Sequence, residues 1–212
     1  MFINVSDESI DVQSQWERAP LGAIEALAKF PVALIGDVQK RIGMMSSAIR
    51  PTTRNAKFFG TILPILTREG DNLAIHRGID EAQPGDVLVI NGNSETNRAV
   101  FGDILAEICL SKKISAVVID GATRDVEEIE KMGLPVFARG INPAGPSKTG
   151  PGTVGIPVAC GNLVCNPGDA IIGDRDGIII IARKDVAAYA EKVAAQDGFE
   201  ESLRAKIRAS IA

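Results

Sequence analysis

The apolar residues of this chain fall into spaced runs, which predict helices, and short continuous runs, which predict strands. The spaced runs predict helices within residues 20–30, 71–86, 97–113 and 126–132, and a terminal helix from residue 184. The continuous runs predict strands at residues 32–39, 58–66, 87–93, 114–119, 134–140, 156–160, 162–165, 169–174 and 177–182. Strands and helices therefore alternate through the centre of the chain, and short strands follow.

Prolines and glycines mark where several of these elements end. Pro64 argues that the run at 58–66 is a strand end or a sheet edge, because proline cannot donate a hydrogen bond within a sheet. The tripeptide Pro-Gly-Asp occurs at 84–86 and at 167–169, each time before an apolar strand, which indicates one turn used twice. The terminal helix is expected to be interrupted near Asp197-Gly198.

The order of the elements predicts the fold class. The run from residue 87 to residue 140 predicts parallel βαβαβ units, residues 141–155 predict a long irregular loop, and tight β turns follow. This combination favours an α/β fold with three β/β/α layers over a doubly wound sheet. No sharp boundary divides residues 1–212, so we expect a single domain. Residues 1–30 would form an N-terminal arm and helix, and residues 184–212 a C-terminal helix.

Composition and charge narrow the partners. The net charge is −4 and no stripe of lysine and arginine is visible, so we expect no nucleic-acid partner. The three cysteines show no disulfide framework; Cys160 and Cys165 could form half of a metal site, but no second pair exists. The sequence has no secretory signal and no stretch of about 18 uncharged apolar residues. We therefore expect a cytoplasmic protein with no membrane partner.

The stretch AVVIDGATRD joins an apolar strand to the polar pair Arg124-Asp125. In α/β sheets, ligands bind beyond the carboxyl ends of the strands. Arg124 can hold a carboxylate at two points and Asp125 can hold a hard cation, so the pair suits an oxo-acid together with Mg²⁺ or Mn²⁺. On local sequence alone the alternative is favoured, in which Asp125 is a helix N-cap and Glu128 its capping-box partner.

A second candidate lies at Phe101-Gly102-Asp103-Ile104, where a glycine interrupts the helical pattern. Glycine inside a helix costs roughly 1 kcal/mol relative to alanine. Its presence makes sense if the helix begins near Gly102-Asp103, where free backbone N–H groups would face an anion. The alternative is a tolerated glycine that allows close helix packing.

His76 is the only histidine, so acidic groups must carry most acid–base chemistry. It lies in a predicted helix beside Arg77, where a structural role is favoured over a catalytic one. Without a serine–histidine or cysteine–histidine pattern, acyl-transfer triads are disfavoured. The sequence contains no P-loop and no G-x-G-x-x-G after a strand, so a nucleotide has no recognisable binding loop.

These motifs carry a resemblance to a known family. The segment AVFGDILAEICLSKKISAVVIDGATRDVEEIEKMGLPVFARG resembles the centre of the RraA-like family. That family includes class II 4-hydroxy-4-methyl-2-oxoglutarate / 4-carboxy-4-hydroxy-2-oxoadipate aldolases and the regulator of ribonuclease activity A. GDVLVI at 85–90 and NPGDAIIGDRDGIIII at 166–181 support it, and it covers most of residues 30–210. The resemblance implies a swivelling β/β/α fold, like phosphohistidine domains, and homotrimers or homohexamers.

In the aldolase branch, a glycine-led loop is followed about twenty residues later by Arg-Asp, and Gly102-Asp103 and Arg124-Asp125 match this pattern. The match implies that Asp125 holds the divalent metal, largely through waters. It implies that Arg124 binds the carboxylate and carbonyl oxygens of the substrate, and that Asp103 orients or deprotonates a water. The pyruvate carboxylate would be held by the backbone amides of Gly102, Asp103, Ile104 and Leu105.

The family also uses a glutamate from the C-terminal helix of a neighbouring subunit. Glu200, four residues before Arg204, matches better than Glu201. The non-catalytic regulators in the family lack the full acidic metal set, which this chain keeps. The resemblance therefore favours the enzyme branch.

The activity implied is a carbon–carbon lyase with a small oxo-acid substrate. We expect cleavage of 4-hydroxy-4-methyl-2-oxoglutarate-type hydroxy-oxo-diacids to pyruvate, with oxaloacetate decarboxylation, through an enolate stabilised by Mg²⁺ or Mn²⁺. The competing hypothesis is a non-catalytic, protein-binding regulator of ribonuclease activity. A methyltransferase is disfavoured, because no glycine-rich loop suits S-adenosylmethionine.

Overall fold

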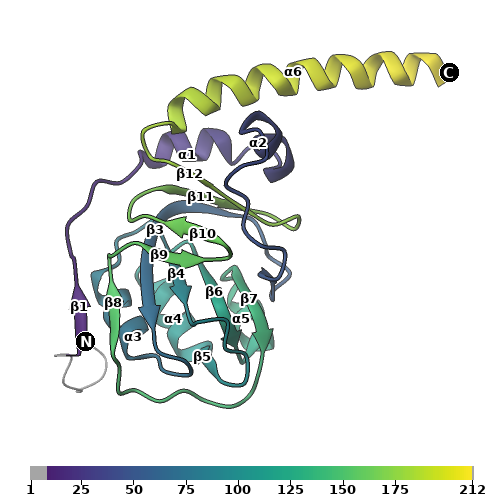
Figure 1. Cartoon of the computed structure of the whole chain (residues 1–212). Helices are drawn as coiled ribbons and strands as arrows, with labels where there is room; N and C mark the ends of the chain where they lie inside the picture. The colour runs from purple at the N-terminus through teal and green to yellow at the C-terminus, as the bar shows by residue number, and fades with distance from the viewer. Residues whose placement is uncertain (1–8, 212) are drawn as a thin grey trace.

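A computed structural model describes residues 9–211 of the chain (Figure 1). The polar arm expected at residues 1–8 lies outside the described residues. The molecule is built on a mixed sheet with strand order β1-β8-β3-β4-β6-β7-β2. Its central, mutually parallel strands are β3 (Phe58–Thr67), β4 (Asp86–Asn91), β6 (Ala116–Thr123) and β7 (Val136–Ile141). The edge strands are β1 (Ile10–Val12) and β2 (Arg50–Pro51), and β8 (Gly152–Val154) lies between β1 and β3.

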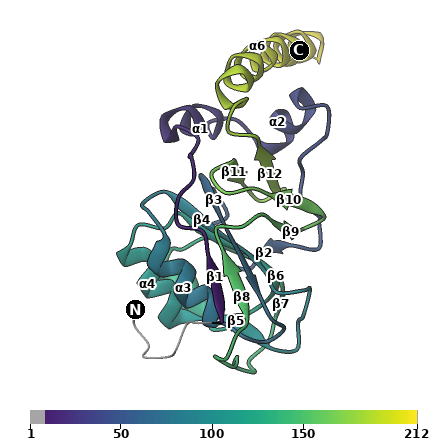
Figure 2. The same cartoon turned by 60° about the vertical axis from the view of Figure 1, so that its left-hand side comes forward.

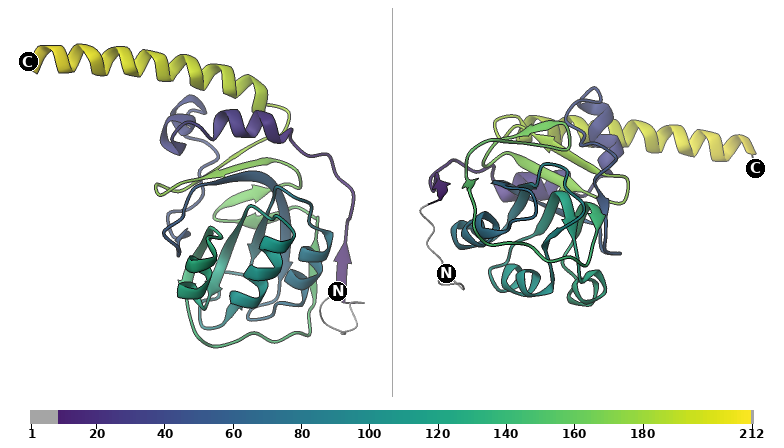
Figure 3. Two further views of the ribbon diagram at one scale, coloured as in Figure 1. Left: turned by 180° about the vertical axis from the view of Figure 1, so that it is seen from behind. Right: turned by 60° about the horizontal axis from the view of Figure 1, so that its bottom comes forward.

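One face of this sheet is covered by helices, as Figure 3 shows from behind. These helices are α3 (Leu73–Glu81), α4 (Asp103–Ser111) and α5 (Val126–Met132). The path β4–α4–β6–α5–β7 is the predicted βαβαβ run, and its strands pair in parallel register, with Val89 opposite Val118. The α/β class is therefore confirmed.

The other face of the sheet is covered by strands. β9 (Val158–Cys160) and β10 (Leu163–Cys165) form a hairpin, and β11 (Ala170–Gly173) pairs with both β3 and β12 (Ile178–Ile181). In β4, Leu88 and Ile90 pack toward the helices, while Val87 and Val89 pack toward the hairpin. Burial on both faces explains why this strand reads as a continuous apolar run.

A second group of helices lies outside these layers (Figure 2). It consists of α1 (Leu21–Leu27), α2 (Val32–Val38) and α6 (Val186–Ile211), which pack with the outer faces of β11 and β12. α6 runs past the body of the molecule and its far end stands clear of it in every view. No helix within residues 9–211 is long and apolar enough to cross a membrane.

The strand predicted at 32–39 is wrong, because this segment is helix α2. Short apolar runs do not separate a strand from a buried helix by pattern alone. Val32 and Ile35 are buried while Ala33 and Asp37 are exposed, which is the spacing of one helical face. Pro31 precedes the first turn, and the Asp174 carboxylate accepts the Val32 N–H at 2.9 Å.

The helix predicted at 97–113 begins later than the apolar pattern indicated. Its first apolar residues form β5 (Ala99–Phe101), which pairs with the end of β6, and α4 starts at Asp103. β6 in turn continues through Asp120 to Thr123, where a loop was predicted. Val100 and Phe101 are buried in either arrangement, so their hydrophobicity could not decide between helix and strand.

Pro64 lies within β3, so the prediction of a strand end or edge is wrong. The Ile62 N–H donates to Asp169 O on the side of the strand where the Pro64 carbonyl accepts from Gly155 N. At this point the neighbour of β3 changes from β11 to β8. The missing N–H of Pro64 therefore faces the junction between two strands, where no ladder partner is lost.

Two further expectations about turns have different outcomes. Both Pro-Gly-Asp turns are built alike, with Gly85 at φ +89° and Gly168 at φ +79°, and the aspartates that follow, Asp86 and Asp169, are buried. α6 is continuous, so the predicted interruption near Asp197-Gly198 is wrong. A single glycine costs a helix only about 1 kcal/mol, too little to end a helix of this length.

Candidate active site

Apart from Glu200, the predicted site residues gather where β5 leads into α4 and β6 leads into α5. Gly102 is the N-cap of α4, as the interpretation of a helix start required. A Cβ atom at Gly102 would lie 2.5 Å from Asp125 Oδ2 and 3.1 Å from Arg124 Nε. Glycine is therefore needed for the close approach of these two side chains, not for helix packing.

Asp125 occupies the N-cap position of α5 but does not behave as a cap. Its backbone is left-handed, with φ +57°, and its carboxylate caps no amide of α5 in the described chain. Asp125 Oδ2 instead lies 3.1 Å from Arg124 Nε and accepts the Asp103 N–H at 3.4 Å. Glu128, the expected capping-box partner, pairs with Lys131. Neither Asp125 nor Glu128 uses its side chain to cap α5, so the capping interpretation is wrong.

Arg124 is fixed by its backbone at the end of β6. Its N–H donates to Phe101 O at 3.0 Å, and the neighbouring Thr123 hydroxyl donates to the same oxygen at 3.2 Å. The Arg124 and Asp125 side chains are 37% and 34% exposed, so both remain reachable by a ligand. A Cβ at Gly145 would lie 2.9 Å from Arg124 Nη1, so the long loop passes directly beside the guanidinium.

These residues border a cavity of about 250 Å³. Its lining comprises Asn72, His76, Val100, Phe101, Gly102, Asp103, Ile104, Leu105, Arg124, Gly145, Pro146 and Lys148. Every predicted substrate-binding residue is among them. Asp125 is not in the lining, but it joins the cavity through its contacts with Arg124 and Asp103.

The start of α4 supplies the positive end of a helix dipole to this cavity. The amide of Asp103 donates to Asp125, and that of Ile104 donates to Asp103 Oδ1 at 2.8 Å. Of the four amides predicted to hold a carboxylate, two are therefore occupied by carboxylates of the protein itself. An incoming anion would use the remaining amides or replace these contacts.

Three polar residues of the lining, Asn72, His76 and Lys148, were not among the predicted site residues. Asn72 and His76 stand four residues apart at the start of α3, and Asn72 Oδ1 and His76 Nε2 are buried without a hydrogen-bond partner in the described chain. Burial lowers the pKa of His76, and the charge of Lys148 lowers it further. The helical spacing of Asn72 and His76 was visible in the sequence, but nothing there indicated that this face meets a cavity.

The loop at 141–155 is anchored as a wall of the cavity. Asp71 is fully buried and accepts hydrogen bonds from Ser147 Oγ at 2.8 Å, Thr149 N at 2.7 Å and Gly150 N at 3.1 Å. Burial alone would raise the pKa of Asp71, but these bonds and that from Leu73 N hold it below its usual value. A charged Asp71 therefore fixes the loop that carries Gly145, Pro146 and Lys148.

The acidic residues near the cavity can contribute to holding one divalent cation. Among residues 9–211 no group of three or more His, Cys, Asp or Glu side chains is arranged for a metal. The Asp125 carboxylate nevertheless accepts the backbone N–H of Asp103, so the two acidic residues are in contact. Mg²⁺ is commonly held by only one or two carboxylates, its other positions being filled by water and substrate. The donor set therefore fits such an ion.

Glu200 does not reach this group within one chain. It lies on α6 and pairs with Arg204 at 3.0 Å, while Glu201 pairs with the same arginine at 2.7 Å. Figure 1 shows α6 at the opposite end of the molecule from β5, where the cavity lies. The assignment of Glu200 to a neighbouring subunit's site stays a prediction.

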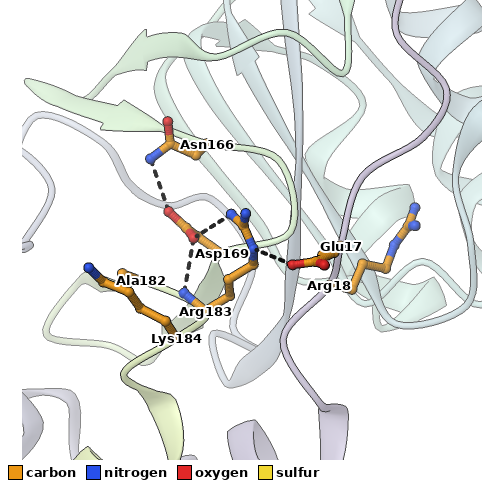
Figure 4. Close-up of a pocket in the computed structure, with 7 residues that line it drawn as sticks. All are labelled: Glu17, Arg18, Asn166, Asp169, Ala182, Arg183 and Lys184. Carbon is orange, nitrogen blue, oxygen red and sulfur yellow. Dashed lines mark hydrogen bonds and ion pairs between the residues drawn. The ribbon is translucent and has the colours of Figure 1, made fainter.

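A larger cavity, of about 620 Å³, lies elsewhere (Figure 4). Its charged groups are largely matched: Asp169 accepts from Asn166 Nδ2 and Arg183 N, and Arg183 lies 3.7 Å from Glu17. It contains none of the predicted residues. The volume of a cavity alone does not mark a site, and the smaller cavity is the one at which charged groups and a constrained backbone converge.

Comparisons with known proteins show the family to which the chain is similar. A family model described as RraA-like, Aldolase/RraA, matches residues 4–180. A protein of Halalkalibacterium halodurans named "Putative 4-hydroxy-4-methyl-2-oxoglutarate aldolase" is 33% identical over 187 residues, covering 87% of this chain and 89% of that protein.

Solved structures share the fold. An unusual member of the RNase ES inhibitor RraA protein family from Streptomyces coelicolor has a TM-score of 0.79 at 23% identity, covering 89% of this chain and all of that one (100%). The RNA-processing inhibitor RraA from Thermus thermophilis has a TM-score of 0.67 at 24% identity, covering 72% of this chain and 92% of that one. At these identities the likeness shows the fold alone.

Proposed function

Because this chain belongs to the RraA-like family, we propose that it is a divalent-metal-dependent carbon–carbon lyase. Its substrates would be hydroxy-oxo-diacids of the 4-hydroxy-4-methyl-2-oxoglutarate type, cleaved to pyruvate, with oxaloacetate decarboxylation as a second reaction. The similarity to the Halalkalibacterium halodurans protein, which is named as an aldolase, supports this class.

The proposal rests on one observation above others, the position of Asp125. A non-glycine residue in the left-handed region is uncommon, and such strain persists where the surroundings enforce it. Here the backbone at φ +57° turns the carboxylate away from its own helix and against Gly102, beside Arg124. An aspartate that served only as a cap would point the other way, toward the amides of α5.

Each residue of the site has its own role in the proposed reaction. The start of α4 and the Arg124 guanidinium bind the carboxylate and the carbonyl oxygen of the oxo-acid and stabilise negative charge there. Asp103, whose side chain is partly exposed at the cavity, takes the hydroxyl proton through a water in aldol cleavage. Mg²⁺ or Mn²⁺, held by Asp125 with Asp103 beside it, would supply Lewis acidity at the carbonyl oxygen.

Pyruvate release tests this proposal. We expect pyruvate from hydroxy-oxo-diacids and from oxaloacetate with Mg²⁺ or Mn²⁺, and none after chelation. Asp125→Asn is the sharper variant, because asparagine tolerates the left-handed backbone that alanine would strain. Lys57→Met, an exposed residue far from the cavity, serves as control. Activity that survives both chelation and Asp125→Asn would overturn the mechanism.

The assembly and the detailed fold are also proposals. We propose a homotrimer or homohexamer in which Glu200 of one chain approaches Asp125 of the next. We also propose that the layers formed by α3–α5, the central sheet and the β9–β10 hairpin correspond to the swivelling β/β/α arrangement of phosphohistidine domains. The competing function, a non-catalytic regulator of ribonuclease activity, would be favoured by capture of a ribonuclease without metal binding or pyruvate release.

A further inference from the structure

A second group of polar residues lines the cavity, contributed by the start of α3 and by the 141–155 loop and not by the end of β6. There Asn72 and His76 leave buried polar atoms without partners in the part of the chain described, and Lys148 stands close enough to His76 to lower its pKa by charge. Asn72 is only 5% exposed. A buried polar group without a partner is costly, so its persistence beside a cavity points to a ligand that satisfies it.

Lys148 is the cation of this group of polar residues. It is exposed and lines the cavity, and it forms no ion pair with another residue of the range 9–211. The loop that carries it is fixed at both sides by Asp71, through Ser147 and through Thr149. Lys148 is therefore presented to the cavity by an anchored backbone and not by a free loop.

We propose that Asn72, His76 and Lys148 bind the second carboxylate of a dicarboxylic oxo-acid, while Arg124 and the start of α4 bind the first. The inference rests on the proposed function and adds the residues that select a diacid. Lys148 supplies the charge, His76 donates a hydrogen bond from Nε2, and Asn72 donates one from Nδ2 once its amide has turned to exchange Oδ1 for Nδ2. A substrate without the second carboxylate would leave these groups desolvated and unpaired.

The two reactions of the proposed enzyme should depend differently on Asn72, His76 and Lys148. Aldol cleavage breaks the bond between C3 and C4, and the second carboxylate stays ionised on the departing oxo-acid. Decarboxylation of oxaloacetate breaks the bond between C3 and C4 as well, but C4 is the carboxylate, which loses its charge as it becomes CO₂. An interaction with Lys148 therefore assists the first reaction and is lost during the second.

The experiment compares Lys148→Met with wild type on three substrates: 4-hydroxy-4-methyl-2-oxoglutarate, its analogue 4-hydroxy-2-oxopentanoate without the second carboxylate, and oxaloacetate. We expect kcat/KM for the diacid to fall roughly 10- to 100-fold, as for loss of a charged hydrogen bond. We expect kcat/KM for the analogue to be unchanged, and kcat for oxaloacetate to be unchanged or higher. Lys148→Arg should restore much of the diacid activity.

Asn72→Asp adds a charge of the opposite sign without a change of size, and it should weaken the diacid selectively for the same reason. Lys57→Met is the matched control and should leave all three substrates unaffected. Equal losses on diacid and analogue, or no loss on the diacid, would overturn the assignment while leaving the lyase intact. Absence of any pyruvate from the wild-type protein would overturn the proposed function, and this inference with it.

Discussion

Gly102 is the residue at which the helix start, the metal-binding candidate and the arginine meet. We predict that Gly102→Ala lowers kcat/KM for pyruvate release roughly 10- to 100-fold, because a displacement of catalytic groups by about 1 Å has effects of that size. The new methyl group would lie 2.5 Å from Asp125 Oδ2 and must displace it. Steady-state kinetics with a thermal melt tests this. Gly22→Ala, where nothing lies within 4 Å of the added Cβ, is the control.

The lowered pKa of His76 leads to a prediction about how stability depends on pH. Burial and Lys148 lower its pKa in the folded protein below the ordinary value of 6.5, so the unfolded chain binds this proton at a higher pH than the folded chain does. The free energy of unfolding should therefore fall as the pH drops below about 6.5, until the folded protein also takes up the proton. Urea unfolding at about pH 7.5 and at about pH 5.5 measures the loss, and His76→Gln should reduce it. An equal loss in the variant would assign it to other groups.

At the scale of single residues, the sequence was informative wherever chemistry and backbone both constrained the residue type. Arg124, Asp125 and Gly102 stood out because their types are unusual in their local setting, and the structure brings all three together. Asn72 did not stand out, since an asparagine before a helix is ordinary as a cap. Only the cavity, formed by residues far apart in the chain, reveals that its side chain caps nothing among the described residues.

Among the elements, the loop at 141–155 depends on one buried carboxylate. We predict that Asp71→Asn weakens the anchoring of the loop by about 1–3 kcal/mol, the usual cost of losing charged hydrogen bonds at a buried group. Amide hydrogen exchange should become faster at Thr149 and Gly150, because the backbone N–H groups of both residues donate hydrogen bonds to the Asp71 carboxylate. KM for the diacid should rise more than kcat falls, because Lys148 loses its position. Asp37→Asn, in an exposed pair with Arg41, should change neither quantity.

Elements with a long, regular pattern were predicted well, and elements whose position depends on partners were not. The strands of the parallel sheet are apolar on both faces, so their sequences identify them without the fold. Segment 32–39 became helix α2 because Asp174, from the turn between β11 and β12, caps its first amide. Pro64 fits inside β3 because the neighbouring strand changes beside it. Neither circumstance is visible in local sequence.

At the scale of the whole molecule, α6 holds Glu200 away from the cavity of its own chain. Its outer half exposes Phe199, Leu203 and Ile207 at four-residue intervals, an apolar stripe on one helical face. Such a stripe suits a symmetric assembly better than solvent. A site completed by a neighbour is consistent with this surface.

Subunit complementation tests that arrangement directly. If Glu200 of one chain serves Asp125 of the next, Asp125→Asn and Glu200→Gln homo-oligomers should each have low activity. Mixed oligomers would regain it, because about a quarter of randomly paired sites would combine an intact Asp125 with an intact Glu200. Activity is measured after co-expression with two different affinity tags, selecting the mixed species. If Glu200 acts within its own chain or has no role, the mixed oligomers would show only the average of the two parents. Glu201→Gln, one residue along the same helix, distinguishes the two glutamates and should complement only if it, and not Glu200, faces the neighbouring cavity.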